Sequence, residues 1–184
     1  MAMIMLAGWK TANAEEKKIS GPLDFRMKNI DGKEVDLTSY RGKVLLFVNV
    51  ASKCGFTPQY EQLTALKTRY ADKGFEVLGF PANNFMHQEP GSDAEIKVFC
   101  QTKYNVNFPI FSKISVGGDD IHPLYKFLTD KKTDPKFHGR ISWNFEKFLI
   151  GRDGQILDRF GPKVEPNADE VIKAVEAALA SATN

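Results

Sequence analysis

Apolar residues in this chain fall into short runs that polar turns separate. Two runs, Val44–Val50 and Phe75–Phe80, are almost continuously apolar, which is typical of central strands covered on both faces. Between them, Gln59–Lys73 carries apolar residues at helical spacing, and Gly74 fits a C-terminal cap. The pattern therefore predicts a strand, a helix and a second strand in direct succession.

Two β-hairpins are predicted on either side of this unit. Near the N-terminus, Phe25–Ile30 and Lys33–Leu37 flank an Asp-Gly turn. Later in the chain, Phe145–Ile150 and Gln155–Phe160 flank a turn that contains two glycines. Each pair is expected to form antiparallel strands.

Helix-start signals mark the remaining elements. Ser92 and Glu95 form the capping-box pattern before one helix, and Asn167 is expected to cap the last helix. Ile110–Val116 is interpreted as a short strand and His122–Leu128 as a helix. The order of elements predicts an α/β fold in one domain over residues 19–184.

Composition narrows the functional classes. The chain has 184 residues, of which 42% are hydrophobic and 26% charged, as in ordinary globular proteins. A net charge of +2, spread among acids, does not favour nucleic acid as a partner. No apolar stretch reaches the roughly 18–20 residues of a membrane span, so no stable membrane insertion is expected. Two cysteines are too few for a disulfide scaffold.

The N-terminal segment has two interpretations. Met1–Ala7 is apolar, and an Ala-Asn-Ala sequence ends at Ala14, which resembles a secretory cleavage site. No basic residue precedes the apolar stretch. Residues 1–18 are therefore either a trimmed export signal of a periplasmic or otherwise exported protein, or a disordered tail of a cytoplasmic one.

Cys54 is the strongest candidate for chemistry. It follows the predicted strand 44–50 and precedes a predicted helix, whose free N–H groups would favour a thiolate. Lys53 adds a neighbouring positive charge. Thr57 occupies the position of the second cysteine in a C-x-x-C motif, so a single attacking thiol is expected. The alternative is that Cys54 is a small buried apolar residue.

Three longer motifs surround this cysteine. They read Asn-Val-Ala-Ser-x-Cys-Gly-x-Thr at 49–57, Phe-Pro-x-Asn-x-Phe-x-x-Gln-Glu-Pro-Gly-Ser at 80–92, and Trp-Asn-Phe-x-Lys-Phe-Leu at 143–149. In this order they closely resemble the glutathione peroxidase family, from about residue 23 to 162. The resemblance implies a thioredoxin-like fold with a central mixed β-sheet, flanking helices and an N-terminal hairpin.

The resemblance also implies a catalytic tetrad. The nucleophile matches Cys54, the glutamine matches Gln88, and the Trp–Asn pair matches Trp143 and Asn144. These roles suit peroxide reduction, because an indole N–H and two amides can hydrogen-bond a thiolate and orient the peroxide. Taken alone, Trp143 would more often be a core aromatic residue, and the two amides would more often belong to turns or caps.

Cys100 is the second cysteine that could take part in the chemistry. In the thioredoxin-dependent members that this chain resembles, a resolving cysteine lies in the segment matching Phe99–Phe108. Gln101 occupies the expected register here, and Cys100 precedes it by one residue. Cys100 is interpreted either as a resolving cysteine that requires its helix to unwind, or as an inert core cysteine.

The resemblance implies a thiol-dependent peroxidase that reduces hydrogen peroxide and organic or lipid hydroperoxides through a sulfenic acid. A thioredoxin-like protein is the expected reductant, and glutathione is the alternative. A short stretch between Leu128 and Ile141 implies a monomer, because tetrameric members carry an insertion there. No cofactor is expected, and the three scattered histidines do not indicate a metal site. Two other functions stay open: a peroxide sensor that oxidises a partner protein, and a redox-inert thioredoxin-fold binding module.

Overall fold

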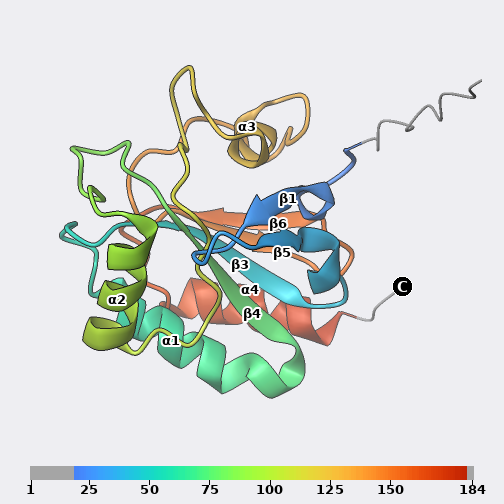
Figure 1. Cartoon of the computed structure of the whole chain (residues 1–184). Helices are drawn as coiled ribbons and strands as arrows, with labels where there is room; N and C mark the ends of the chain where they lie inside the picture. Colours follow the sequence, from blue (N-terminus) through green and yellow to red (C-terminus); the bar gives the residue numbers. More distant parts are fainter. Residues whose placement is uncertain (1–18, 182–184) are drawn as a thin grey trace, which may run out of the picture.

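A computed structural model describes residues 19–181 and contains a four-stranded mixed sheet (Figure 1). Its order is β4-β3-β5-β6. The strands β3 and β4 are parallel, whereas β5 pairs antiparallel with both β3 and β6. The predicted mixed sheet is therefore confirmed, and the predicted cleavage site after Ala14 lies outside the described residues. The strand bounds are β3 Val44–Val50, β4 Phe75–Pro81, β5 Lys147–Ile150 and β6 Ile156–Phe160.

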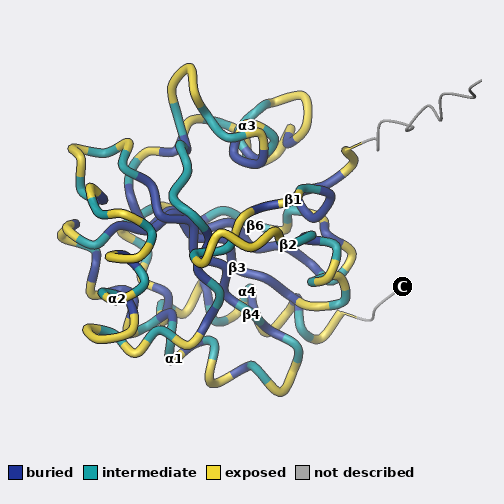
Figure 2. The backbone as a smooth tube through the Cα atoms, in the orientation of Figure 1, coloured by how far each residue is buried: buried dark blue, intermediate teal, exposed yellow. Residues whose placement is uncertain are grey.

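Alternate side chains of β3 enter two separate cores. Leu46 packs on the face covered by α1 (Gln59–Tyr70) and α4 (Asp169–Ala180), whereas Phe47 packs on the face covered by α3 (Pro123–Thr129). All seven residues of β3 are buried, as the dark tube at the centre of Figure 2 shows. A continuous apolar run fits this strand because both of its faces are covered. No helix within residues 19–181 is long and apolar enough to cross a membrane.

The local start and stop signals act as the sequence predicts. Ser92 precedes α2 (Asp93–Tyr104); its Oγ accepts from the Glu95 N–H at 3.3 Å, and the Glu95 carboxylate accepts from the Ser92 N–H at 2.7 Å. A 3₁₀ turn, η3 (Ala71–Lys73), follows α1 and ends at Gly74, which has φ +83°. The predicted N-cap at Ser92 is confirmed, whereas Gly74 caps η3 and the α-helix itself ends at Tyr70.

The N-terminal hairpin forms a small sheet of its own. β1 (Arg26–Lys28) and β2 (Glu34–Asp36) pair antiparallel, and Gly32 in the turn has φ +75°. Met27 joins the core under α3, so the hairpin covers the same face of the main sheet as that helix. Two 3₁₀ turns, η1 (Pro22–Asp24) and η2 (Leu37–Tyr40), flank the hairpin.

The expected strand at Ile110–Val116 is wrong. The segment makes only isolated bridges: two parallel ones, from Ile110 to Gly79 of β4 and from Ile114 to Ala82 just after β4, and an antiparallel one from Phe111 to Asn29. The offset between partners changes by one residue from the first bridge to the second, so no regular ladder forms. Other backbone groups of this segment bond to the hairpin instead; the Ile30 N–H donates to the Ile110 carbonyl at 2.9 Å.

Two predicted boundaries also shift. Ala168, not Asn167, is the N-cap of α4, and its side chain makes no capping hydrogen bond. β5 begins at Lys147 because Phe145 has φ +65°, a left-handed conformation that an extended strand does not allow. The predicted helix beginning at His122 is confirmed, with His122 as N-cap and Pro123 as first helical residue.

Candidate active site

Cys54 lies in the loop that leaves the carboxyl end of β3. The Phe56 N–H donates to Cys54 Sγ at 3.4 Å, and the cysteine is 8% exposed. A backbone N–H aimed at sulfur stabilises negative charge on it. The expected donor was the first turn of the helix, but α1 begins only at Gln59. The contact therefore comes from the turn between strand and helix.

Thr57 holds this loop in shape. Its hydroxyl accepts from the Cys54 N–H at 2.9 Å and donates to the Ala51 carbonyl at 2.8 Å. The Thr57 N–H also donates to the Cys54 carbonyl at 3.0 Å. The residue that replaces a second cysteine thus has a structural role, and the loop carries a single thiol.

The structure brings Gln88 and Asn144 into direct contact. Asn144 Nδ2 donates to Gln88 Oε1 at 2.9 Å, and Asn144 is fully buried. The Gln88 carbonyl accepts from the Lys53 N–H at 3.0 Å, which ties its loop to the residue beside Cys54. Two of the predicted site residues therefore meet at the cysteine loop, as ligand-binding loops do beyond the carboxyl ends of parallel strands.

Trp143 is half-buried and packs against Phe85, with ring centroids 5.3 Å apart. Trp143 and Phe56 line the same cavity, so the indole lies on the Cys54 side of the sheet end. The catalytic role expected for Trp143 stays a prediction.

Asn49 is a site residue that the sequence analysis missed. It is fully buried on β3, donates from Nδ2 to the Trp143 carbonyl at 2.9 Å and accepts at Oδ1 from the Glu146 N–H at 3.2 Å. Its own carbonyl accepts from the Phe145 N–H at 2.6 Å, which holds the left-handed conformation there. The signal that could have found it is a lone amide inside an apolar run.

Asn83 has a comparable structural role in the neighbouring loop. Its Oδ1 accepts from the Glu89 N–H at 2.9 Å, so it closes the loop that carries Gln88. Glu89 itself is buried, and desolvation raises the pKa of its carboxyl group. The Asn83 contact therefore fixes the backbone directly after Gln88.

Cys100 lies on α2, and its side chain faces the protein core rather than solvent. It is 2% exposed, and its Sγ donates to Tyr60 Oη at 3.6 Å. Burial raises the pKa of this thiol to about 11, and the Tyr60 contact only partly offsets that effect. Both cysteines are free. In this state, Cys100 is a weak nucleophile that aromatic side chains enclose.

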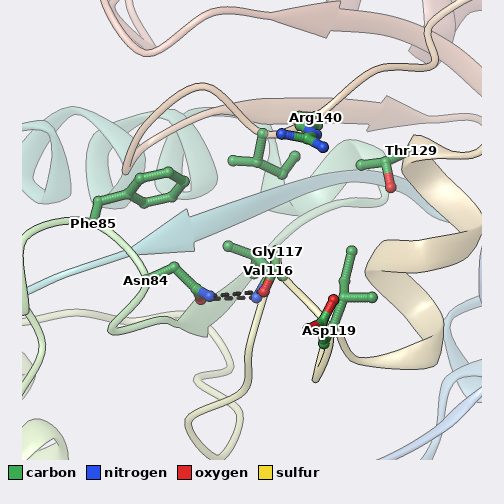
Figure 3. Close-up of a pocket in the computed structure, with 10 residues that line it drawn as sticks. Asn84, Phe85, Val116, Gly117, Asp119, Thr129 and Arg140 are labelled. Carbon is green, nitrogen blue, oxygen red and sulfur yellow. Dashed lines mark hydrogen bonds between the residues drawn. The ribbon is translucent and has the colours of Figure 1, made fainter.

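Another cavity lies beside Phe85, which forms part of its lining. Figure 3 shows the residues that line it. The Asn84 side chain bonds to the neighbouring loop: its Nδ2 donates to the Gly117 carbonyl at 3.0 Å, and its Oδ1 accepts from the Val116 N–H at 2.9 Å. The cavity has a volume of about 520 Å³ and also exposes Asp119. Neither cysteine lines it, so it is separate from the thiol.

Comparisons with known proteins agree with this geometry. The glutathione peroxidase family model matches residues 23–129. The thioredoxin/glutathione peroxidase BtuE of Escherichia coli strain K12 is 47% identical over 173 residues, covering 84% of this chain and 94% of that protein.

Solved structures show the same family and fold. The crystal structure of Trgpx in its apo form has a TM-score of 0.67 and 42% identity, covering 88% of this chain and 97% of the other. A thioredoxin-family thiol:disulfide interchange protein from Chlorobium tepidum TLS has a TM-score of 0.63 at 16% identity, covering 89% of this chain and 99% of the other, and shows the thioredoxin-like fold alone. On the matched family model and the similarity over nearly the full length of these relatives, this chain belongs to the glutathione peroxidase family.

Proposed function

We propose that this protein is a thiol peroxidase with Cys54 as its nucleophile. The observation that carries the proposal is a single thiol in a loop built around it, with the Phe56 N–H on the sulfur and Thr57 in place of a second cysteine. Family membership supports hydroperoxides as substrates and a thiol as reductant. The substrates are hydrogen peroxide and organic hydroperoxides.

The reaction divides into an oxidation and a reduction. The Cys54 sulfur attacks the terminal peroxide oxygen, so an S–O bond forms while the O–O bond breaks. The departing oxygen takes the proton that the thiol released and leaves as water or an alcohol. Cys54 is then a sulfenic acid, oxidised by two electrons. Two thiol groups of the reductant supply two electrons and two protons, which restore the thiol and release water.

Gln88, Trp143 and Asn144 are proposed to bind the peroxide and the thiolate. With Gln88 Oε1 accepting from Asn144, the Gln88 Nε2 hydrogens remain to donate. The Trp143 indole supplies another donor. Donors held in place before the reaction stabilise the charge that develops on the departing oxygen.

The physiological reductant is proposed to be a thioredoxin-like dithiol protein, with glutathione as the alternative; the name of the Escherichia coli relative includes both. Cys100 is proposed to form the intermediate disulfide with Cys54, for which α2 must open. We also propose a monomer that is exported and cleaved after Ala14.

Mass spectrometry after one equivalent of hydrogen peroxide tests the proposal. The expected product is a Cys54 sulfenic acid, trapped with dimedone, or a Cys54–Cys100 disulfide. A control peroxidase in a parallel sample shows that the same peroxide is reactive. If both cysteines of this protein stay unmodified while the control is oxidised, the protein is not a thiol peroxidase.

A further inference from the structure

The turn that carries Trp143 and Asn144 closes on a single carboxylate. Glu146 ends this turn, just before β5, and is 4% exposed. Its Oε2 accepts from the Ser142 N–H and from the Ser142 hydroxyl, both at 2.7 Å. The segment from Ser142 to Glu146, which we call the Trp143 turn, is therefore closed by a side chain.

Arg159 holds the other oxygen of this carboxylate. Its Nε donates to Glu146 Oε1 at 2.6 Å, and its Nη2 forms an ion pair with the same oxygen. Arg159 lies opposite Phe148 in the ladder of β5 and β6, and its guanidinium carbon is 4.9 Å from the centre of that ring. The sheet therefore places the cation, and the cation holds the carboxylate beside the sheet.

The same arginine binds the segment that precedes the turn. Its Nη1 donates to the Phe137 carbonyl at 2.6 Å and to the Gly139 carbonyl at 2.9 Å, and its Nη2 donates to the Arg140 carbonyl at 2.8 Å. All five N–H groups of Arg159 thus face Glu146 or one of these three carbonyls. A buried ion pair is favourable only with such satisfied geometry, so the pair restricts the Trp143 turn to one arrangement.

The other end of the Trp143 turn is fixed from β3. Phe145 has φ +65°, and its N–H donates to the Asn49 carbonyl at 2.6 Å. The Glu146 N–H donates to Asn49 Oδ1 at 3.2 Å. A left-handed residue other than glycine persists only where its surroundings fix it. Trp143 and Asn144 therefore lie between two anchors, the Glu146 carboxylate at the start of the turn and Asn49 at its end.

We propose that Glu146 is a positioning residue for peroxide reduction: its carboxylate fixes the start of the Trp143 turn, so that the Trp143 indole and the Asn144 amide are presented to Cys54 in one arrangement. The inference rests on the proposed function and adds to it a residue that acts through its neighbours. Donors that are already in place need no reorganisation when charge develops on the departing oxygen, so their placement affects the rate.

The first test measures the second-order rate constant for Cys54 oxidation by hydrogen peroxide in single turnovers, without reductant. Glu146→Ala frees Ser142 and leaves Arg159 without its carboxylate. The rate constant is expected to fall about tenfold, because a small displacement of a catalytic group can cost up to about 10²-fold. Glu146→Gln keeps the volume and an oxygen for Ser142, and it should lose less. A wild-type rate constant in Glu146→Ala, or in Glu146→Gln if the alanine variant does not fold, would overturn the inference.

A second comparison tests whether Glu146 acts through Trp143 and Asn144. In a background that carries Trp143→Phe and Asn144→Ala, adding Glu146→Ala should change the rate constant less than about twofold, because the groups that Glu146 positions are gone. A decrease in that background as large as in the wild type would show that Glu146 acts elsewhere, and the inference would be wrong.

Arg152→Ala is the control for a loss of stability alone. Arg152 donates to three backbone carbonyls, those of Gly42 and Lys73 before β3 and β4 and that of Leu179 in α4. Its removal should lower the free energy of unfolding and leave the oxidation rate constant unchanged. An equal loss of rate in Arg152→Ala would assign the effect of Glu146 to stability and overturn the inference.

A spectroscopic measurement separates this inference from the proposed function. The chain has two tryptophans, so in a Trp9→Phe background the fluorescence reports on Trp143 alone. Glu146→Ala should shift the emission to longer wavelength and raise quenching by acrylamide, because the half-buried indole loses its fixed place. Unchanged emission and quenching would overturn the inference. If wild-type Cys54 is not oxidised by any hydroperoxide, the proposed function fails, and the fluorescence still decides whether Glu146 positions Trp143.

Discussion

Asn144 Nδ2 donates to Gln88 Oε1 across 2.9 Å, joining two residues that are 56 positions apart in the sequence. One lies in the loop after β4 and the other just before β5. The hydrogen bond uses the oxygen of the Gln88 amide and so orients its nitrogen as a donor. We therefore treat the two amides as one unit in the chemistry at Cys54.

Removing the nucleophile should abolish the reaction. In Cys54→Ser, the sulfur that receives the Phe56 N–H is lost, and a neutral hydroxyl is a far weaker nucleophile towards peroxide. Peroxide consumption with thioredoxin or glutathione should fall to background, while circular dichroism stays that of the wild type. Cys100→Ser is the matched control for loss of one thiol when peroxide consumption is measured in a single turnover without reductant, where it should match the wild type. Turnover that persists in Cys54→Ser would refute the assignment.

The two amides should show non-additive effects. Gln88→Ala removes a donor, and Asn144→Ala releases the Gln88 amide from its fixed orientation, so each should slow Cys54 oxidation. One preorganised donor typically contributes about 2.7–4 kcal/mol to an oxyanion transition state, and a sulfur site should lie at or below that range. The double variant should be little slower than the slower single variant. Stopped-flow measurements give the oxidation rate of each variant. If the fold-decrease in the double variant equals the product of the two single fold-decreases, the residues act separately.

Replacement of Asn49 should lower both the stability of the protein and the rate of thiol oxidation. Asn49→Leu removes the bonds to the Trp143 carbonyl and the Glu146 N–H, leaving both groups without that partner inside the protein. A loss of about 1–3 kcal/mol in the free energy of unfolding is expected, together with slower thiol oxidation. Denaturant titration and oxidation kinetics measure the two effects. Asn107→Leu, at an exposed asparagine, is the control and should change neither.

Cys100 should matter only after the first oxidation. In Cys100→Ser, Cys54 oxidation should keep its rate, whereas turnover with thioredoxin should stall and Cys54 should be overoxidised. Because Cys100 is buried and contacts Tyr60, α2 is expected to open so that the two Cα atoms can reach the roughly 4.4–6.8 Å that a disulfide requires. Amide exchange across Phe99–Asn105 should rise on oxidation. Full thioredoxin turnover in Cys100→Ser would instead indicate direct reduction of the sulfenic acid.

Lys147 should make stability depend on pH. Burial lowers its pKa from 10.5 to about 7, so the unfolded chain binds this proton more strongly than the folded protein does. Burial of the protonated Lys147 amine lowers the free energy of unfolding, and this destabilisation is complete below about pH 7. It disappears as the pH rises towards 10.5, so stability increases with pH in this window.

Comparison with Lys147→Met isolates that effect. Between about pH 6.5 and pH 9, the free energy of unfolding of the wild type should rise relative to the variant by on the order of 2 kcal/mol. Urea titrations at the two pH values measure it. Lys126→Met, at an exposed lysine on α3, should show no such pH dependence. An equal difference at both pH values would mean that Lys147 keeps its proton throughout.

The sequence alone predicted the features that neighbouring residues decide. The fully buried strand at Val44–Val50, the cap at Ser92, the stop at Gly74 and the turn at Gly32 all depend on periodicity, capping and glycine conformation. These are short-range effects, so no knowledge of the fold was needed. The family motifs also singled out Cys54 and the residues proposed to serve it.

Long-range contacts decided the rest. Residues 110–116 are not a strand, because their backbone divides its hydrogen bonds between β4 and the hairpin. Three hydrogen bonds likewise join segments that are distant in the chain. They link Asn144 to Gln88, Asn49 to the Trp143 carbonyl, and Lys147 to the Val164 carbonyl. The two partners of each hydrogen bond come together only when the sheet has formed and brought these loops to its end. Hydrogen bonds and burial depend on positions in space, which neighbouring residues in the sequence do not decide.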